Sequence, residues 1–180
     1  FGGKTLSILI CEDLWDAKNL YLMQEQVFDY AISINSSPFD ASKIERRTNI
    51  AKKIALATKK PFLYVNQVGG QDSLVFDGSS FAVDENGNDV VRLKEFAQDF
   101  AVVNSESLVA DGLKASSQKS ELSSTKNNTL YIQRIYNALT LAMRDYLAKT
   151  GFQKVLLGMS GGIDSALVAA IAVDALGSQN

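Results

Sequence analysis

Short apolar runs alternate with helix-like segments over the first part of the chain, and this alternation restricts the fold more than any other feature. Continuous apolar runs are typical of buried strands, whereas apolar residues that recur every three or four positions indicate one face of a helix. The sequence therefore predicts an α/β fold, with strands at Thr5–Ile10, Tyr30–Ile34 and Phe62–Val65. Helices are expected at Asp16–Phe28 and between Ser42 and Pro61. Ser42 and Glu45 are predicted to form a capping box at the start of the second helix.

A β-rich stretch follows. Val75–Asp84 and Asp89–Leu93 flank Glu85-Asn86-Gly87-Asn88, a turn sequence at hairpin spacing. Phe100–Val103 is predicted to be one further strand. The pair Gly69-Gly70 is interpreted as a tight turn between strands, without chemistry of its own.

A change in composition then divides the chain. Residues 105–128 are rich in Ser, Lys, Asn and Thr, so they are predicted to link a unit at 1–104 to a second unit at 129–180. The second unit should contain a helix that ends before Gly151, a short buried strand at Val155–Leu157 and a helix at Asp164–Leu176. One helix-strand-helix unit cannot bury its own faces, so we expect this domain to be incomplete.

The composition argues against several classes of function. The net charge of −2 argues against a nucleic-acid surface, because phosphate neutralisation needs clustered Lys and Arg. No apolar run approaches the roughly 20 residues that span a bilayer. Histidine is absent, which removes Ser-His-Asp and Cys-His catalysis and most zinc sites from these residues. The single cysteine, Cys11, permits no internal disulfide and favours a reducing cytoplasm.

Ser160-Gly161-Gly162-Ile163-Asp164-Ser165 lies between the last predicted strand and helix. This order presents unpaired backbone N–H groups to an anion, and the glycines let the backbone approach phosphate oxygens. The serines can add hydrogen bonds, and Asp164 can hold Mg²⁺ against the phosphates. The turn has no Lys and its glycines are adjacent, so it is neither a Walker A loop nor a dinucleotide fingerprint. The alternative is a Gly-Gly turn in which Asp164 only caps the helix.

The motif resembles the signature of the PP-loop ATP pyrophosphatases, which cleave ATP between its α- and β-phosphates to adenylate a substrate. The resemblance implies a metal ion at Asp164. It also implies ATP binding by Gly158, Met159, Ser160, Gly161, Gly162, Ile163, Asp164 and Ser165.

Cys11 ends the first predicted strand and is followed by Glu12 and Asp13. A single cysteine is usually a small core residue, but here the chain leaves the sheet with two carboxylates beside the thiol. A nucleophilic thiol needs a base, and without histidine in these residues that base must be Lys or Glu.

Several segments resemble the nitrilase superfamily, which uses a Glu-Lys-Cys triad. Ile10-Cys11-Glu12-Asp13-Leu14-Trp15 resembles its nucleophile segment, and Phe76-Asp77-Gly78-Ser79-Ser80-Phe81 with the Asn86-Gly87 turn resembles its later core strands. Asn66-Gln67-Val68-Gly69-Gly70-Gln71-Asp72 is similar to one branch, the glutamine-dependent NAD synthetases. Further similar segments are Tyr136-Asn137-Ala138-Leu139, Arg144-Asp145-Tyr146 and Leu157–Leu167.

The order of parts also matches that family, in which a glutaminase precedes a linker and a PP-loop synthetase. The resemblance covers nearly the whole chain, is weakest in the linker, and implies a fragment of such an enzyme. The implied fold is the C-terminal half of a nitrilase-type α-β-β-α sandwich over residues 1–104. It is followed at 129–180 by the start of a PP-loop, adenine nucleotide hydrolase-like parallel α/β domain.

By this resemblance, Cys11 is the nucleophile that attacks the side-chain amide of glutamine, and Glu12, Ser37 and Lys43 bind the glutamine. Lys43 stands where the family has Arg, and an ammonium can pair with a carboxylate but cannot form the bidentate fork. Ser37 can equally begin a turn before Pro38, and Lys43 can be a solvated residue in the first turn of a helix. The general-base Glu and its Lys are expected upstream of Phe1.

The implied reaction is the ATP-dependent amidation of deamido-NAD⁺ to NAD⁺, with ammonia from glutamine and release of AMP and pyrophosphate. It requires ATP and Mg²⁺, and we expect a cytoplasmic homo-oligomer without nucleic-acid or membrane partners. We expect the isolated chain to be inactive. The alternatives are another PP-loop amidotransferase or, for this chain alone, a non-catalytic nucleotide-binding or oligomer-contact piece.

Overall fold

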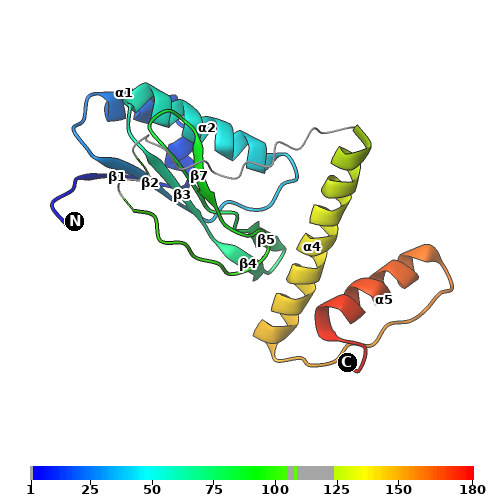
Figure 1. Cartoon of the computed structure of the whole chain (residues 1–180). Helices are drawn as coiled ribbons and strands as arrows, with labels where there is room; N and C mark the ends of the chain where they lie inside the picture. The colour runs from blue at the N-terminus through cyan, green and yellow to red at the C-terminus, as the bar shows by residue number, and fades with distance from the viewer. Residues whose placement is uncertain (1, 105–107, 109–123) are drawn as a thin grey trace.

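The computed structural model describes residues 2–104, 108 and 124–180 (Figure 1). Its main sheet has five strands in the order β1-β2-β3-β6-β7. The first three are parallel, and β6 and β7 extend the sheet antiparallel. The strands are β1 Leu6–Ile10, β2 Tyr30–Asn35, β3 Phe62–Asn66, β6 Phe81–Val83 and β7 Asp89–Arg92. This mixed sheet with its crossover helices confirms the α/β class predicted from the alternating pattern.

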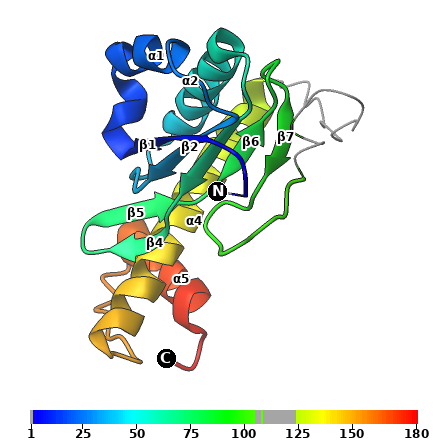
Figure 2. The same cartoon turned by 90° about the vertical axis from the view of Figure 1, so that its left-hand side faces the viewer.

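Helices α1 (Ala17–Gln24) and α2 (Lys43–Thr58) cover one face of the sheet, as Figures 1 and 2 show. A short 3-10 helix, η1 (Cys11–Trp15), leads from β1 into α1, whose first turn is capped by the Asp16 side chain. Parallel strands require such crossover connections, because the chain must return to the same end of the sheet. The core between the layers consists of Leu9, Leu14, Met23, Phe28, Ala31, Ala51, Ile54, Ala55, Phe62, Tyr64, Phe81 and Val83.

The opposite face of the sheet is apolar and is not covered by the described residues. Ile8, Ile10 and Ile34 are 57%, 65% and 53% exposed, and Val65 is 46% exposed. The prediction of buried strands is therefore wrong for this face. Successive side chains of a strand point to opposite faces, and the helices cover only one of them.

The predicted capping box at the start of α2 is also wrong. The Ser42 hydroxyl donates to the Asp40 carboxylate at 2.6 Å and does not cap the helix. This hydroxyl and the Ser42 N–H lower the pKa of Asp40 below its usual value. A short side chain that can bond to a neighbouring turn competes with the capping geometry.

A hairpin of β4 (Val68–Gln71) and β5 (Leu74–Asp77) forms a separate two-stranded sheet. Gly69 and Gly70 lie inside β4, so their interpretation as a tight turn is wrong. The predicted single strand Val75–Asp84 is likewise divided into β5 and β6, because Gly78 and Ser79 both adopt positive φ angles, 64° and 52°. Two successive residues in the left-handed region cannot continue a strand.

Two long helices complete the structure, α4 (Ser124–Thr150) and α5 (Ile163–Leu176). The predicted end of the first before Gly151 is confirmed, as is the helix predicted at Asp164–Leu176. Figures 1 and 2 both place α4 against the β4–β5 hairpin. A second core joins them, made of Phe96, Ala138 and Leu141 with Phe39, Val68 and Val75 packed against it. None of the described helices is both long and apolar enough to cross a bilayer.

Two predicted strands are wrong. Phe100–Val103 and Val155–Leu157 have no regular secondary structure, and Phe100, Val102 and Leu156 are 84%, 84% and 103% exposed. A strand needs a neighbouring strand to receive its backbone hydrogen bonds, and no described strand lies beside either segment. An apolar run alone therefore does not make a strand.

Gly70 is the position at which α4 approaches the hairpin most tightly. A Cβ added there would lie 3.1 Å from Ala142 Cα and 3.2 Å from Asp145 Cβ. We expect Gly70→Ala to push α4 away and to lower the free energy of unfolding by about 1–3 kcal/mol, as overpacking does. Urea unfolding of the chain measures this change. Gly158→Ala, where a Cβ meets open space, is the control, and equal midpoints for both variants would contradict the packing of α4 on β4.

Candidate active site

Cys11 occupies a constrained position at the carboxyl end of β1. Its φ angle is 48°, in the left-handed region that residues other than glycine rarely adopt. Its thiol is half-buried. The Asp13 carboxylate accepts a hydrogen bond from the Ile10 N–H at 2.9 Å, and the buried Leu14 anchors the same turn. Backbone strain held by its surroundings is concentrated at functional sites, so this geometry favours a reactive cysteine over a packing one.

Cys11 shares one edge of the sheet with Ser37. The register pairs Ile10 with Ile34 and Ile34 with Val65, so β1, β2 and β3 end side by side. Ser37 follows the end of β2 and is only 6% exposed. Ligands of open α/β sheets bind outside the carboxyl ends of the strands, and these two predicted residues lie there together.

Glu12 and Lys43 are the other two predicted glutamine-binding residues, and they lie on different elements and differ in exposure. Glu12 follows Cys11 in η1 and its side chain is exposed. Lys43 is the first residue of α2 and is half-buried. Since α2 connects β2 to β3, its amino terminus is at the same edge of the sheet as Cys11.

A buried ion pair lies behind Ser37 and was missed from the sequence. Arg47 is 1% exposed and Asp77 is not exposed at all. Arg47 Nη1 lies 2.8 Å from both Asp77 carboxylate oxygens. Arg47 Nη2 donates to Ser37 O, Ser37 Oγ and Pro38 O at 2.9, 3.0 and 3.0 Å. The signal was present, because Arg47 shares the apolar face of α2 with Ala51 and Ile54.

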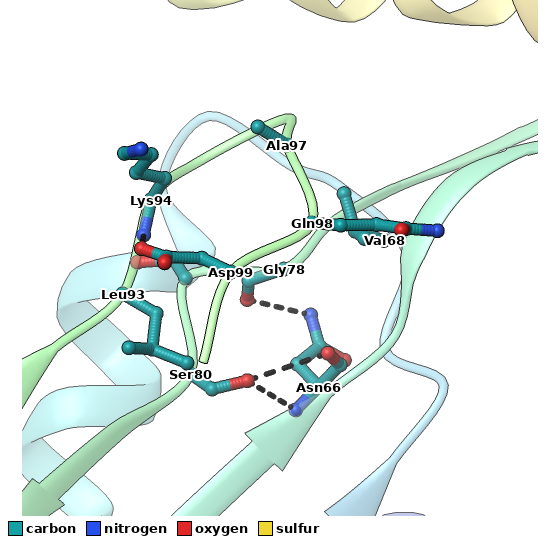
Figure 3. A pocket seen from close by; sticks show the side chains of 10 residues that line it. Asn66, Val68, Gly78, Ser80, Leu93, Lys94, Ala97, Gln98 and Asp99 are labelled. Carbon is teal, nitrogen blue, oxygen red and sulfur yellow. Dashed lines mark hydrogen bonds between the residues drawn. The ribbon is translucent and has the colours of Figure 1, made fainter. Parts of the chain in front are cut away.

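Asn66 joins the same network from the end of β3. Its side-chain oxygen accepts the Ser37 N–H at 3.0 Å, and its amide donates to Gly78 O at 3.2 Å and to Asp77 at 3.3 Å. A cavity of about 310 Å³ lies beside it (Figure 3). Ser80, which also lines the cavity, accepts the backbone N–H of Asn66 at 2.9 Å. The carboxyl end of β3 is therefore both polar and hollowed, but the residues that line this cavity do not include Cys11 or Ser37.

Tyr64 completes the surroundings of Ser37. It is 1% exposed and its ring stacks on Phe81 with 5.0 Å between the ring centroids. Its hydroxyl has no hydrogen bond of normal geometry to the described residues. Burial raises the pKa of this hydroxyl, and the nearby Arg47 and Ser37 oppose the rise only in part. Cys11 also lies close enough to act on the pKa of Tyr64.

Tyr64→Phe should therefore not destabilise the protein and should make it less sensitive to alkali. The variant loses a buried, unpaired hydroxyl, so we expect a gain of up to about 1 kcal/mol at neutral pH. The pKa of Tyr64 is raised above 10.0 in the folded protein. Titration of Tyr64 therefore leaves the wild-type free energy of unfolding unchanged below pH 10.0 and lowers it as the pH rises above 10.0. Urea midpoints at neutral and alkaline pH measure both effects. Tyr21→Phe, at a 69% exposed position, is the control, and a clear loss of stability in Tyr64→Phe at neutral pH would show that the hydroxyl is paired.

The predicted phosphate loop stands at the amino terminus of α5. Gly161 has a φ angle of 81° and Gly162 is the N-cap residue of the helix. The Ser160 and Ser165 hydroxyls are 3.0 Å apart, and Ser160 Oγ accepts the Gly162 N–H at 3.3 Å. The predicted binding residues from Gly158 to Asp164 are exposed and Ser165 is half-buried, so the first turn of the helix is open to an anion.

Asp164 has a suitable setting for Mg²⁺. It is exposed in the first turn of α5, beside the loop. Among the described residues, no group of three or more acidic or cysteine side chains could hold a metal ion by itself. Mg²⁺ is usually held by one or two carboxylates together with substrate phosphates, so a single carboxylate beside a phosphate loop fits this ion.

Helix α4 contacts both the β4–β5 hairpin and helix α5, which begins at the predicted phosphate loop. The Asp145 carboxylate accepts the Gly70 N–H of the hairpin at 2.7 Å, and the Lys149 ammonium donates to Gly70 O. Tyr136 donates to Asp174 of α5 at 2.7 Å, which raises the pKa of Tyr136. Tyr136 therefore links α4 to α5. The thiol and the phosphate loop lie on separate elements, because Cys11 follows β1 and the loop precedes α5.

Two families match different parts of the chain. Residues 1–109 match the carbon-nitrogen hydrolase family, and residues 135–180 match the NAD synthase family. The chain is 37% identical to the glutamine-dependent NAD⁺ synthetase of Synechocystis sp., a match that covers 97% of this chain and 32% of the relative. It is 36% identical to the enzyme of the same name from Rhodobacter capsulatus, over 99% of this chain and 31% of the relative. The chain thus spans about a third of the length of these curated relatives.

The fold has a close match among solved structures. The glutamine-dependent NAD⁺ synthetase of Acinetobacter baumannii in complex with ADP superposes with a TM-score of 0.81 at 35% identity. The match covers 99% of this chain and 32% of the other. The same arrangement of sheet, hairpin and two long helices therefore occurs within a larger enzyme.

Proposed function

The chain belongs to the carbon-nitrogen hydrolase family, and from this premise we propose that it is part of a glutamine-dependent NAD⁺ synthetase. One observation carries the proposal. A strained cysteine at the carboxyl end of a sheet and a Gly-Gly phosphate loop at a helix start occur in one chain. A thiol nucleophile and a nucleotide loop are the two parts that an ammonia-transferring ligase needs.

In the proposed glutaminase step, the Cys11 thiolate attacks the side-chain carbonyl carbon of glutamine. The C–N bond breaks, ammonia leaves with a proton from the general acid, and a thioester remains on Cys11. Water then attacks the thioester, releasing glutamate and restoring the thiol. The family's Glu and Lys, which move these protons, are expected outside these 180 residues. The left-handed conformation of Cys11 and its half-burial support this role, because they hold the thiol at the edge of the sheet.

Glu12, Ser37 and Lys43 would hold the glutamine. Glu12 is exposed next to the thiol and can pair with the substrate α-amino group. Ser37 and the Lys43 ammonium can pair with the α-carboxylate, although Lys43 supplies only a point charge where an arginine would supply a fork. All three lie at the carboxyl edge of the sheet, which supports binding there.

In the proposed synthetase step, a carboxylate oxygen of deamido-NAD⁺ attacks the α-phosphate of ATP and pyrophosphate leaves. Ammonia then attacks the acyl carbon of the adenylate, and AMP leaves with the former carboxylate oxygen. The loop N–H groups and the Ser160 and Ser165 hydroxyls would bind the phosphates and stabilise their developing charge. Mg²⁺ held by Asp164 would supply further neutralisation of that charge.

The wider proposal follows the sequence. Residues 1–104 would form the glutaminase part, 105–128 the linker and 129–180 the start of the synthetase part. Helix α4 begins at Ser124, within the end of this linker. We also propose a homo-oligomeric, cytoplasmic enzyme whose substrates are glutamine, ATP and deamido-NAD⁺.

Transfer of isotope tests the proposal directly. The full-length enzyme, meaning this chain within a polypeptide as long as its relatives, is incubated with Mg-ATP, deamido-NAD⁺ and glutamine labelled with ¹⁵N in the amide. We expect NAD⁺ that is one mass unit heavier by mass spectrometry, even in the presence of unlabelled ammonium. Unlabelled ammonium alone is the control for the synthetase. A folded enzyme that makes NAD⁺ from neither nitrogen source would refute the substrate assignment.

A further inference from the structure

We propose that Arg47 and Asp77 are positioning residues for glutamine binding, because they hold the Ser37 hydroxyl as a hydrogen-bond donor toward the substrate α-carboxylate. This inference rests on the proposed function and adds two residues to it. Neither residue touches the substrate, and both act through Ser37.

The first argument is the burial of two charges. Arg47 and Asp77 are 1% and 0% exposed, so both ions have lost nearly all their contact with water. Removing such a pair from water commonly costs as much free energy as the ions regain from each other, and an apolar pair of similar volume often folds equally well. The burial of this pair therefore calls for a role beyond stability.

The second argument is where the remaining Arg47 hydrogen bonds go. Nη1 is occupied by Asp77, and Nη2 reaches three oxygens of the segment Ser37–Pro38. Asn66 holds the same segment from the other side through the Ser37 N–H at 3.0 Å. Asp77 orients Arg47 and also accepts from Asn66 at 3.3 Å. Arg47 and Asn66 therefore both bond to Asp77, and together they fix the orientation of Ser37.

The third argument is the direction of the Ser37 proton. A guanidinium has only donors, so the Ser37 oxygen must accept the hydrogen bond from Arg47 at 3.0 Å. The hydroxyl proton of Ser37 is then left to donate elsewhere. A carboxylate is an acceptor without a proton and makes the stronger, charge-assisted hydrogen bond. Arg47 thus makes Ser37 suited to an anionic group.

The fourth argument is position. Ser37 lies at the edge of the sheet where Cys11 lies, because β1 and β2 end side by side. Ser37 is 6% exposed, so only a group seated directly on it can reach its hydroxyl. The competing acceptor is the Tyr64 oxygen itself. If Ser37 donates to Tyr64, the network is structural and glutamine binding does not depend on it.

The test compares two substrates of the full-length enzyme. Glutamine carries the α-carboxylate, whereas 4-aminobutanamide keeps the amine and the amide and lacks it. For Arg47→Lys we expect the KM for glutamine to rise about 10- to 100-fold, as loss of a hydrogen bond to a charged group does. The kcat for glutamine and the kcat/KM for 4-aminobutanamide should change less than about threefold. Arg46→Lys, in the same helix but over the Trp15 ring, is the matched control.

Ammonium-driven NAD⁺ formation reports whether each variant is folded. If Arg47→Lys loses ammonium-driven NAD⁺ formation, Ser37→Ala is measured in its place. Ser37→Ala removes only the hydroxyl and should raise the KM for glutamine but not the KM for 4-aminobutanamide. Equal effects on both substrates, or an unchanged KM in Ser37→Ala, would overturn the inference. Failure of the wild-type enzyme to hydrolyse glutamine would instead refute the proposed function.

Discussion

Replacing Cys11 by alanine is expected to lower glutamine-driven NAD⁺ formation by about a thousandfold or more and to leave ammonium-driven formation intact. A covalent intermediate cannot form without the thiolate, and loss of a nucleophile that acts with its partners removes most of the catalysis at once. The synthetase loop lies on a different element, at the start of α5, so its chemistry does not need Cys11.

The measurement is NAD⁺ formation by the full-length enzyme with Mg-ATP, deamido-NAD⁺ and either nitrogen source. Cys11→Ser is the matched variant, because it keeps the size of the side chain and replaces only the thiol. We expect it to lose glutamine-driven synthesis as well. Substantial glutamine-driven synthesis by Cys11→Ala would show that Cys11 is a packing residue after all.

Replacing Asp164 by alanine is expected to give the complementary pattern. NAD⁺ formation should fall by about 100-fold or more with both nitrogen sources, because charge on the phosphates is no longer neutralised in the transition state. Glutamine hydrolysis to glutamate should continue, since Cys11 follows β1 whereas Asp164 lies in α5. Asp164→Asn should in addition need a higher Mg²⁺ concentration for half-maximal synthesis.

Asp174→Asn is the control for a lost carboxylate on the same helix. Asp174 accepts a hydrogen bond from Tyr136, a role that asparagine can keep, so this variant should stay close to wild type. An Asp164→Ala enzyme that synthesises NAD⁺ at the wild-type rate would rule out the metal role. Asp164 would then only favour the amino terminus of α5 as a nearby negative charge.

Predictions that depended on neighbouring residues were mostly correct. The strands at Thr5–Ile10 and Tyr30–Ile34 and the helix at Asp164–Leu176 follow from periodicity, which is a local property. Cys11 and the phosphate loop were proposed as sites from their immediate neighbours alone, and these assignments stay predictions. The positive φ angle of Gly161 fits the sequence analysis of the loop, whereas the positive φ angle of Cys11 was not predicted.

Predictions that depended on distant partners were wrong or were not made. Val155–Leu157 has the composition of a strand, but no described strand pairs with it. Gly69-Gly70 has the composition of a turn, yet the close approach of α4 is what requires Gly70. No pattern of consecutive residues reports either fact.

The ion pair behind Ser37 shows the same division most clearly. Arg47 and Asp77 are 30 residues apart. Arg47 has polar neighbours in sequence, and Asp77 follows the apolar run Leu74–Phe76. Consecutive residues specify the α/β class and indicate the two candidate sites, because backbone conformation and amphipathicity are decided within a few positions. The identity of a buried charge's partner depends on how separate elements pack. Only the tertiary structure decided it, since desolvation forces such charges to meet across the fold.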